Sequence, residues 1–172
     1  GGVAHWLPKA LMCDFVRTEI ILTQGGFYAD ADCRCAAAPR TWERWATGND
    51  LLFCKEHQGR SIFNGFFGAR PNHPTIERLV DALRDVQRRL DLRYRREGPS
   101  YVNLIEEVSC RFWRKTLDAQ NIPVEFAAEI DYRKRRPPHA IRSLQGSRWP
   151  GLFHLGLGSW RGAMFSIEEG AA

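Results

Sequence analysis

The chain has 172 residues and a mass of 19.7 kDa, and 44% of its residues are hydrophobic while 26% are charged. This length fits one domain, and the apolar content excludes disordered, collagen-like and low-complexity classes because a packed core can form. The net charge of +5 favours an anionic partner such as a nucleotide diphosphate, a nucleic acid or a membrane surface. No apolar run reaches the roughly 18 residues that span a bilayer, so no transmembrane segment is predicted.

The N-terminal part of the chain predicts one helix followed by two short strands. The helix covers residues 8–24 and ends at a Gly-Gly pair. Its apolar stripe consists of Leu11, Phe15, Thr18 and Leu22. The strands are expected at residues 27–29 and 33–35, so Asp30 and Asp32 follow directly where the first strand ends.

The rest of the chain predicts two more helices and four more strands. The helices are expected at residues 74–96 and 100–117, and the strands at 51–54, 61–68, 124–126 and 152–154. His73 should cap the first of these helices. The second should turn inward Val102, Ile105, Val108 and Phe112. This mixed order favours an α/β fold over a bundle or a sandwich and predicts a ligand site at the carboxyl ends of strands.

Asp30 and Asp32 form the residue pair with the clearest chemical potential. Carboxylates at positions i and i+2 can converge on one hard cation where a turn breaks the alternation of a strand. Mg²⁺ or Mn²⁺ fits such a site, because both cations prefer oxygen ligands. Taken alone, a D-x-D pair is more often a solvated turn than a metal site.

The sequence around this pair carries a more specific pattern. Asp14-x-x-Arg17, followed by Gly-Gly-Phe-Tyr28-Ala-Asp30-Ala-Asp32, resembles the sugar-binding region of the D-x-D glycosyltransferases. That family includes fungal initiating mannosyltransferases, bacterial capsular-polysaccharide transferases and, more distantly, the clostridial glucosylating toxins. Its pattern runs Ser-Asp-x-x-Arg, an apolar helix and Gly-Gly-x-Tyr-x-Asp-x-Asp. Here a cysteine replaces the serine, and the other elements are present in order.

Three later stretches extend the resemblance to residues 8–162. Residues 63–69 are similar to the family's Asn-bearing strand, and residues 71–74 are similar to its Gly-His-Pro helix start. Residues 98–100 resemble the family's Thr-Gly-Pro turn, and His154 with Ser159-Trp160 resembles its closing His and Ser-Trp pair. The combination is much more specific than any one of its parts.

The resemblance implies a metal-dependent, retaining hexosyl- or N-acetylhexosaminyltransferase of polysaccharide biosynthesis, which uses a UDP- or GDP-sugar and a glycan, lipid or protein acceptor. It implies that Asp30 and Asp32 hold Mn²⁺ or Mg²⁺ and act in catalysis together with Arg17. The residues implied to bind the donor are Asp14, Arg17, Gly26, Tyr28, Asn64, His154, Ser159 and Trp160. The setting implied is the bacterial cytoplasm, with a membrane-associated or toxin setting as alternatives.

The same resemblance implies a GT-A-like nucleotide-diphospho-sugar transferase fold, in which helices flank a mixed sheet. The domain would extend over residues 1–172. Because the chain starts Gly-Gly and only seven residues precede the first predicted helix, we expect it to lack part of the N-terminal nucleotide-binding half.

Each site residue also has an ordinary structural interpretation. Asp14 and Arg17 are three apart and would by default form a surface ion pair, and Asn64 would cap the end of a strand. His154 and Trp160 would be core residues. A degenerate transferase fold that binds a partner or glycan without turnover stays open. Nucleic acid, bound through the basic run at residues 133–136, is the least favoured partner because no aromatic residues interleave with that run.

Overall fold

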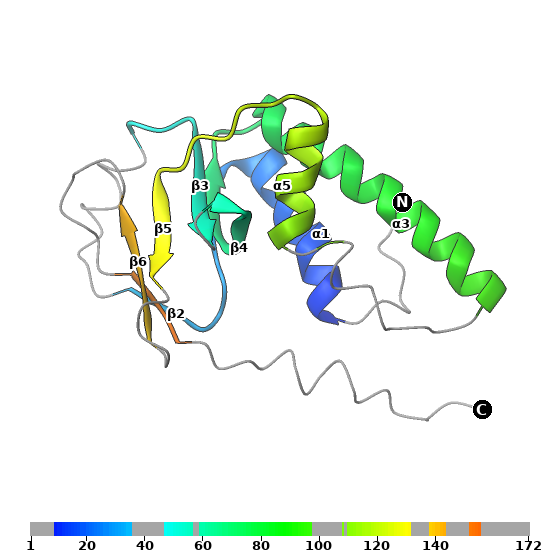
Figure 1. Ribbon diagram of the computed structural model, residues 1–172, viewed down its shortest axis with the longest axis horizontal. Coiled ribbons are helices and arrows are strands. Elements are labelled where there is room, and N and C mark those ends of the chain that lie inside the picture. The colour runs from blue at the N-terminus through cyan, green and yellow to red at the C-terminus, as the bar shows by residue number, and fades with distance from the viewer. Residues whose placement is uncertain are drawn as a thin grey trace.

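The fold is α/β, with a mixed seven-stranded sheet that lies against three helices (Figure 1). It was obtained as a computed structural model, which describes residues 9–35, 47–56, 59–97, 108, 110–131, 138–143 and 152–155. The helices are α1 (Lys9–Gln24), α3 (Pro74–Glu97) and α5 (Cys110–Ala119). The strands are β1 (Gly26–Ala29), β2 (Cys33–Cys35), β3 (Leu51–Glu56), β4 (Ser61–Ala69), β5 (Ala128–Asp131), β6 (His139–Ser143) and β7 (Leu152–His154).

The sheet is curled, and the D-x-D segment connects its two edges. Its strand order is β1-β4-β3-β5-β6-β7-β2, and all neighbours are antiparallel except β3 and β5. β1 and β2 take the first and last places in this order, although only residues 30–32 separate them in the chain. The four Cα–Cα steps from Ala29, at the end of β1, to Cys33, at the start of β2, span at most about 14 Å. The two edges of the sheet must therefore curl toward each other. Asp30 and Asp32 therefore lie in the gap between these edges.

β4 is the central strand of the fold and is buried along its whole length. Its Phe67 stands opposite Phe53 of β3, and the indole of Trp113 on α5 packs edge-on against both rings, with centroid distances of 4.7 and 6.1 Å. Such edge-to-face contacts are the favoured geometry of aromatic pairs. α5 is thus fixed against the sheet by one fully buried indole.

β4 also bulges opposite β3. Phe67 pairs with Phe53 and Ile62 pairs with Lys55, so residues 63–66 of β4 stand opposite the single residue Cys54. A bulge leaves residues unpaired and re-aims their side chains, and bulges are frequent beside active sites. The centre of this bulge is Asn64-Gly65.

The long helix α3 has the predicted apolar face and cap. The side chains that it buries are Ile76, Leu79, Val80, Leu83, Val86 and Leu90. At its N-terminus the backbone N–H of Thr75 donates to Nδ1 of His73 at 3.2 Å, which confirms the predicted cap. None of the helices in the described part of the chain is long and apolar enough to cross a bilayer.

The structure corrects the prediction of a strand at residues 124–126, and it adds β5 and β6. Residues 122–126 form no strand: Pro123 has no N–H to donate to a ladder, and Val124 and Phe126 pack against the Trp113 cluster. β5 starts only at residue 128, beside β3.

The last predicted helix is confirmed in part. α5 ends at residue 119, two residues beyond the prediction, and residues 98–107 lie outside the described part of the chain. Val108 is buried as predicted, whereas Val102 and Ile105 are among the residues not described. Phe112 is only half buried, and the inward side chains of α5 are Trp113 and Leu117.

The end of α1 offers a test of why glycine is needed there. Gly25 has a φ of +69°, and a Cβ at this residue would lie 2.6 Å from Cδ and 2.8 Å from N of Pro71. Gly26 has a φ of +95°, but a Cβ there would meet nothing within 4 Å. We expect Gly26→Ala to lower the free energy of unfolding by about 1–2 kcal/mol through backbone strain. Gly25→Ala should lose more, because the clash with Pro71 is added, and equal losses in urea unfolding would contradict this.

Candidate functional site

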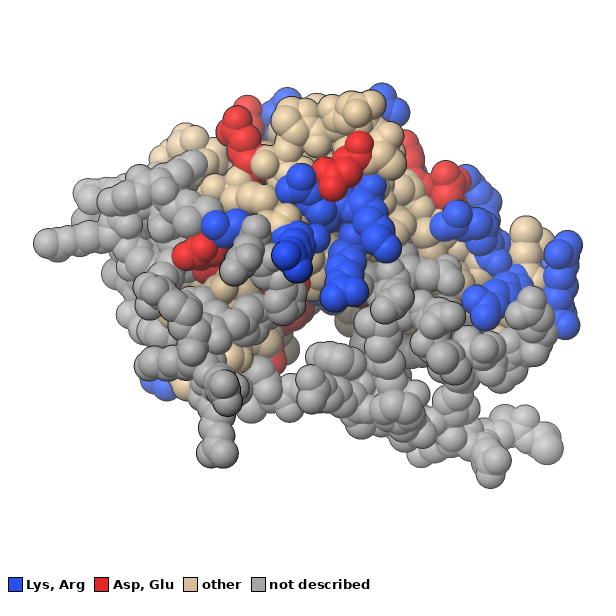
Figure 2. Space-filling view, viewed as in Figure 1, with Lys and Arg blue, Asp and Glu red and all other residues tan. Residues whose placement is uncertain are grey.

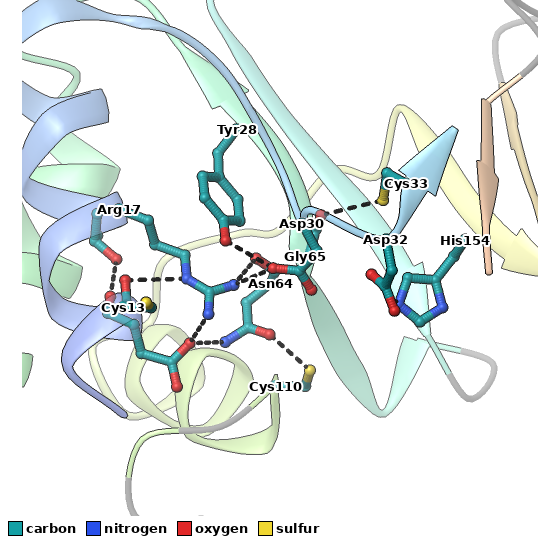
Figure 3. Close-up of polar contacts among 12 residues, drawn as sticks. Cys13, Arg17, Tyr28, Asp30, Asp32, Cys33, Asn64, Gly65, Cys110 and His154 are labelled. Carbon is teal, nitrogen blue, oxygen red and sulfur yellow. Dashed lines mark hydrogen bonds and ion pairs between the residues drawn. The ribbon is translucent and has the colours of Figure 1, made fainter. Parts of the chain in front are cut away.

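Arg17 is the centre of a buried polar cluster (Figure 3). Its Nη1 donates to Oδ1 of Asp30 at 3.0 Å and to the backbone oxygen of Asn64 at 2.9 Å, and its Nη2 lies 2.7 Å from Oδ1 of Asp14. Its Nε donates to the backbone oxygen of Cys13 at 3.1 Å. Asp14 is only 8% exposed, so a surface ion pair does not describe this pair. One guanidinium thus joins α1, the turn after β1, and β4.

Asn64 extends this cluster toward α5. Its Nδ2 donates to Oδ1 of Asp14 at 2.9 Å, and its Oδ1 accepts from the thiol of Cys110 at 3.1 Å. Asn64 is buried in the bulge in the middle of β4, so the alternative of a strand-end cap is wrong. Sequence reasoning missed Cys110, because nothing in the residues around it marks a contact with a strand 46 positions earlier.

Tyr28 orients Asp30 from the side of β1. Its hydroxyl donates to Oδ1 of Asp30 at 2.7 Å, and the Arg17 guanidinium carbon lies 4.6 Å from the centroid of its ring. Burial raises the pKa of the Tyr28 hydroxyl, and the bond to Asp30 raises it further against the opposing effect of Arg17. The hydroxyl therefore stays protonated and acts as a donor. Gly26 lies at the other end of β1, opposite Ala69.

Asp32 meets His154 where β2 pairs with β7. Oδ1 of Asp32 lies 3.2 Å from Nε2 of His154, and each side chain is less than a fifth exposed. β2 pairs with β7 so that Cys33 stands opposite His154, and the N–H of Leu155 donates to the backbone oxygen of Asp32 at 2.8 Å. The backbone therefore holds the residues after Asp30 and the end of β7 in one register.

Asp30, Asp32 and His154 together can hold a cation. Each offers one ligand atom, and these atoms lie within 4.8 Å of one another. Two carboxylates and an imidazole suit a divalent metal ion such as Mn²⁺, and both carboxylates suit Mg²⁺. The resemblance implied His154 as a donor-binding residue only. The structure brings it to the two aspartates, a contact for which the 121 residues between Asp32 and His154 give no local signal.

Burial and charge oppose each other at Asp14. Burial raises the pKa of the Asp14 carboxyl to about 7, although Arg17 lowers it; Asp30 raises it and the hydrogen bond from Asn64 lowers it. For Arg17, burial lowers the pKa, but the two neighbouring carboxylates outweigh burial and raise it. The guanidinium therefore stays charged between Asp14 and Asp30.

Positive charge gathers elsewhere on the molecule. In the view of Figure 2, Lys and Arg side chains cover α5 and run along the end of α3. The basic residues of α5 and of the C-terminal half of α3 are Arg111, Arg114, Lys115, Arg88, Arg89, Arg93, Arg95 and Arg96. Some are paired locally, such as Arg114 with Asp118 and Arg88 with Asp85. The basic run at residues 133–136 lies outside the described part of the chain, as do Ser159 and Trp160.

The chain was compared with protein-family models, curated proteins and solved structures. No family model, curated protein or solved structure matches it.

The raised pKa of Asp14 predicts how stability depends on pH. Because its folded-state pKa of about 7 lies above the ordinary 3.8, the folded protein keeps a proton that the unfolded chain releases. This contribution to stability is complete below about pH 4 and is lost as the pH rises to about 7. Asp14→Asn is neutral throughout, so its free energy of unfolding relative to wild type should rise by roughly 2–3 kcal/mol between about pH 5 and about pH 8.

Urea unfolding at the two pH values measures this difference. Asp118→Asn is the control, because its carboxylate pairs with Arg114 on the surface and is 52% exposed. The control should give the same difference from wild type at both pH values. Parallel pH curves for wild type and Asp14→Asn would contradict the prediction.

Proposed function

We propose that this chain is a metal-dependent, retaining glycosyltransferase that moves a sugar from a UDP- or GDP-sugar to a glycan, lipid or protein acceptor. The observation that supports the proposal is that Asp30 belongs to two groups of residues at once. One side of Asp30 belongs to the buried cluster of Arg17, Tyr28 and Asn64, and the other lies beside Asp32 and His154. A sugar-binding cluster next to a cation site is what a nucleotide-sugar donor requires. Under this proposal the domain is GT-A-like.

The proposed metal ligands are Asp30, Asp32 and His154. Their donor set fits Mn²⁺ or Mg²⁺, and their ligand atoms lie within 4.8 Å of one another. In an extended strand, positions i and i+2 share a face but lie about 7 Å apart, so the turn at residues 30–32 is what lets the two carboxylates converge. A divalent cation bound there would stabilise the negative charge that develops on a departing nucleoside diphosphate. Oδ1 of Asp30 accepts bonds from Arg17 and Tyr28, which orients the carboxylate.

Asp14 is the proposed acceptor for hydroxyl groups of the donor sugar. Its two side-chain contacts given by the described residues, from Arg17 and Asn64, both fall on Oδ1. These two contacts fix the orientation of the whole carboxylate, and with it the position of Oδ2. Such preorganisation is what recognition of a sugar hydroxyl needs. Ser159 and Trp160 stay predicted donors to the diphosphate. In a retaining transfer in which the acceptor attacks the face that the diphosphate leaves, no separate base is required.

A second candidate is a transferase-like domain that binds a donor or glycan without turnover. It is favoured by the bonding of Arg17, whose Nε, Nη1 and Nη2 all have protein acceptors already. In that case Arg17 holds the site together and does not contact a leaving group. Donor binding that depends on Mn²⁺ but gives no release of nucleoside diphosphate would favour this candidate.

Removing the charge of Asp32 and removing the charge of Asp30 should affect the stability of the protein differently. Asp32→Asn should abolish the hydrolysis of UDP- and GDP-sugars in Mn²⁺, and its melting temperature should stay within about 2 °C of wild type. Asp30→Asn should also abolish hydrolysis, but it should lose roughly 2 kcal/mol or more of stability, because it removes a charged partner of the buried Arg17. Nucleoside diphosphate release and thermal unfolding measure the two effects.

The outcomes separate a functional site from a structural one. Calorimetry that shows no Mn²⁺-dependent binding of any UDP- or GDP-sugar to the wild-type protein overturns the proposal. Equal losses of melting temperature in Asp32→Asn and Asp30→Asn would mean that Asp32 is a structural residue.

A further inference from the structure

Gly65 lies beneath the candidate metal ligands, in the centre of the β4 bulge. A Cβ at residue 65 would come closer to Oδ2 of Asp30 than real Cβ atoms approach other atoms, and it would lie 2.6 Å from Cζ of Phe63. The backbone oxygen of Gly65 also accepts the N–H of Asp30 at 2.9 Å. The Asp30 carboxylate thus rests on the backbone of residue 65, in the space that any other residue would fill (Figure 3).

This requirement for glycine is steric. Among the described residues, the glycines with positive φ are Gly25, Gly26 and Gly59, so Gly65 has a backbone conformation open to other residues. A glycine in the interior of a strand weakens the strand and frequently marks a close approach of another group. Here the approaching group is a carboxylate that also accepts bonds from Arg17 and Tyr28 through its other oxygen.

Gly65 also affects His154, the third candidate ligand, because Phe63 lies between them. The Phe63 ring packs edge-on against the His154 ring, with a centroid distance of 5.2 Å and an interplanar angle of 84°. A side chain at residue 65 would therefore have to displace both the Asp30 carboxylate and the ring that supports His154. Arg17 and Tyr28 both bond to Oδ1 of Asp30, so the carboxylate cannot move away from residue 65 without disturbing these bonds.

We infer that Gly65 is a positioning residue of the candidate metal centre, which sets the places of Asp30 and, through Phe63, of His154. This inference rests on the proposed function, because it assigns a role at the proposed metal site. It places one determinant of cation affinity on β4, which itself supplies no ligand. Groups that orient metal ligands typically change affinity by about tenfold to a hundredfold when they are altered.

Mn²⁺ titration followed by electron paramagnetic resonance tests the inference on the full chain. Gly65→Ala should weaken Mn²⁺ binding by roughly tenfold or more. The matched control is Gly68→Ala on the same strand, where a Cβ would meet the Phe27 ring and would lie 2.7 Å from the backbone oxygen of Gly26, away from Asp30. It should lose stability but keep Mn²⁺ affinity within about twofold of wild type. Unchanged affinity in Gly65→Ala, or equal losses in both variants, overturns the inference.

A second measurement keeps the two proposals separate. If wild type binds no Mn²⁺, the proposed metal site fails, whereas the contact between Gly65 and Asp30 is tested without metal by a double-mutant cycle. Gly65→Ala should lower the urea midpoint less in an Asp30→Ala background than in wild type, because the displaced carboxylate is then absent. If Gly65→Ala alone does not fold, the double variant should still unfold at a urea concentration close to that of Asp30→Ala alone. The same loss in both backgrounds, or a double variant that does not fold although Asp30→Ala does, overturns the inference.

Discussion

The interaction on which the site depends is the buried guanidinium of Arg17 between two carboxylates. It joins Asp14 on α1, Asp30 in the turn after β1 and the backbone of Asn64 in β4. Removing one member of a buried ion pair typically costs about 3–5 kcal/mol, because the remaining charge is left in a poorly solvated place. The turn at residues 30–32 has only three residues with which to connect opposite edges of the sheet. A strong cross-link at its first residue therefore fixes both the helix and the turn that brings the two edges of the sheet toward each other.

Asp30 couples the two halves of the candidate site because its two oxygens face different neighbours. Oδ1 accepts from Arg17 and Tyr28, while Oδ2 lies over Gly65 on the side of the bulge. A displacement of the carboxylate toward either side changes bonds on the other, and packed groups of this kind move little without loss of contacts. The orientation of the candidate cation ligand Asp30 and the order of the polar cluster are thus coupled, and a change in either alters the other.

Local patterns in the sequence were sufficient for most elements, whereas the residues of the polar cluster were named through the family resemblance and Cys110 was missed. The predicted helix at residues 8–24 and the strands at 33–35 and 152–154 agree with α1, β2 and β7 to within one residue. Such elements are set by apolar periodicity and glycine stops, which a short window contains. β5 and β6 were missed because four or five residues with charged members do not differ locally from a loop, and their pairing with β3 and β7 is what makes them strands.

The geometry of the site is a non-local property and could not be predicted in the same way. Asn64 and Gly65 resemble a turn signal in the sequence, but in the structure they form a bulge that turns the two residues toward different groups. Whether Asp30 and Asp32 converge with His154 depends on the curl of the whole sheet. Sequence reasoning could therefore name these residues, while their distances required the strand order.

The charge balance of the site differs from that of the chain. The chain carries a net charge of +5, and the basic side chains seen in Figure 2 lie over α5 and α3. The polar cluster and the candidate cation site instead set the carboxylates of Asp30 and Asp32 against the single guanidinium of Arg17. Asp14, whose pKa burial raises to about 7, adds to this negative charge as the pH rises. Such a site attracts a cation more strongly than a diphosphate, whose charges would meet the carboxylates. Under the proposed function, an anionic donor is therefore held well only when a divalent cation lies between it and Asp30 and Asp32.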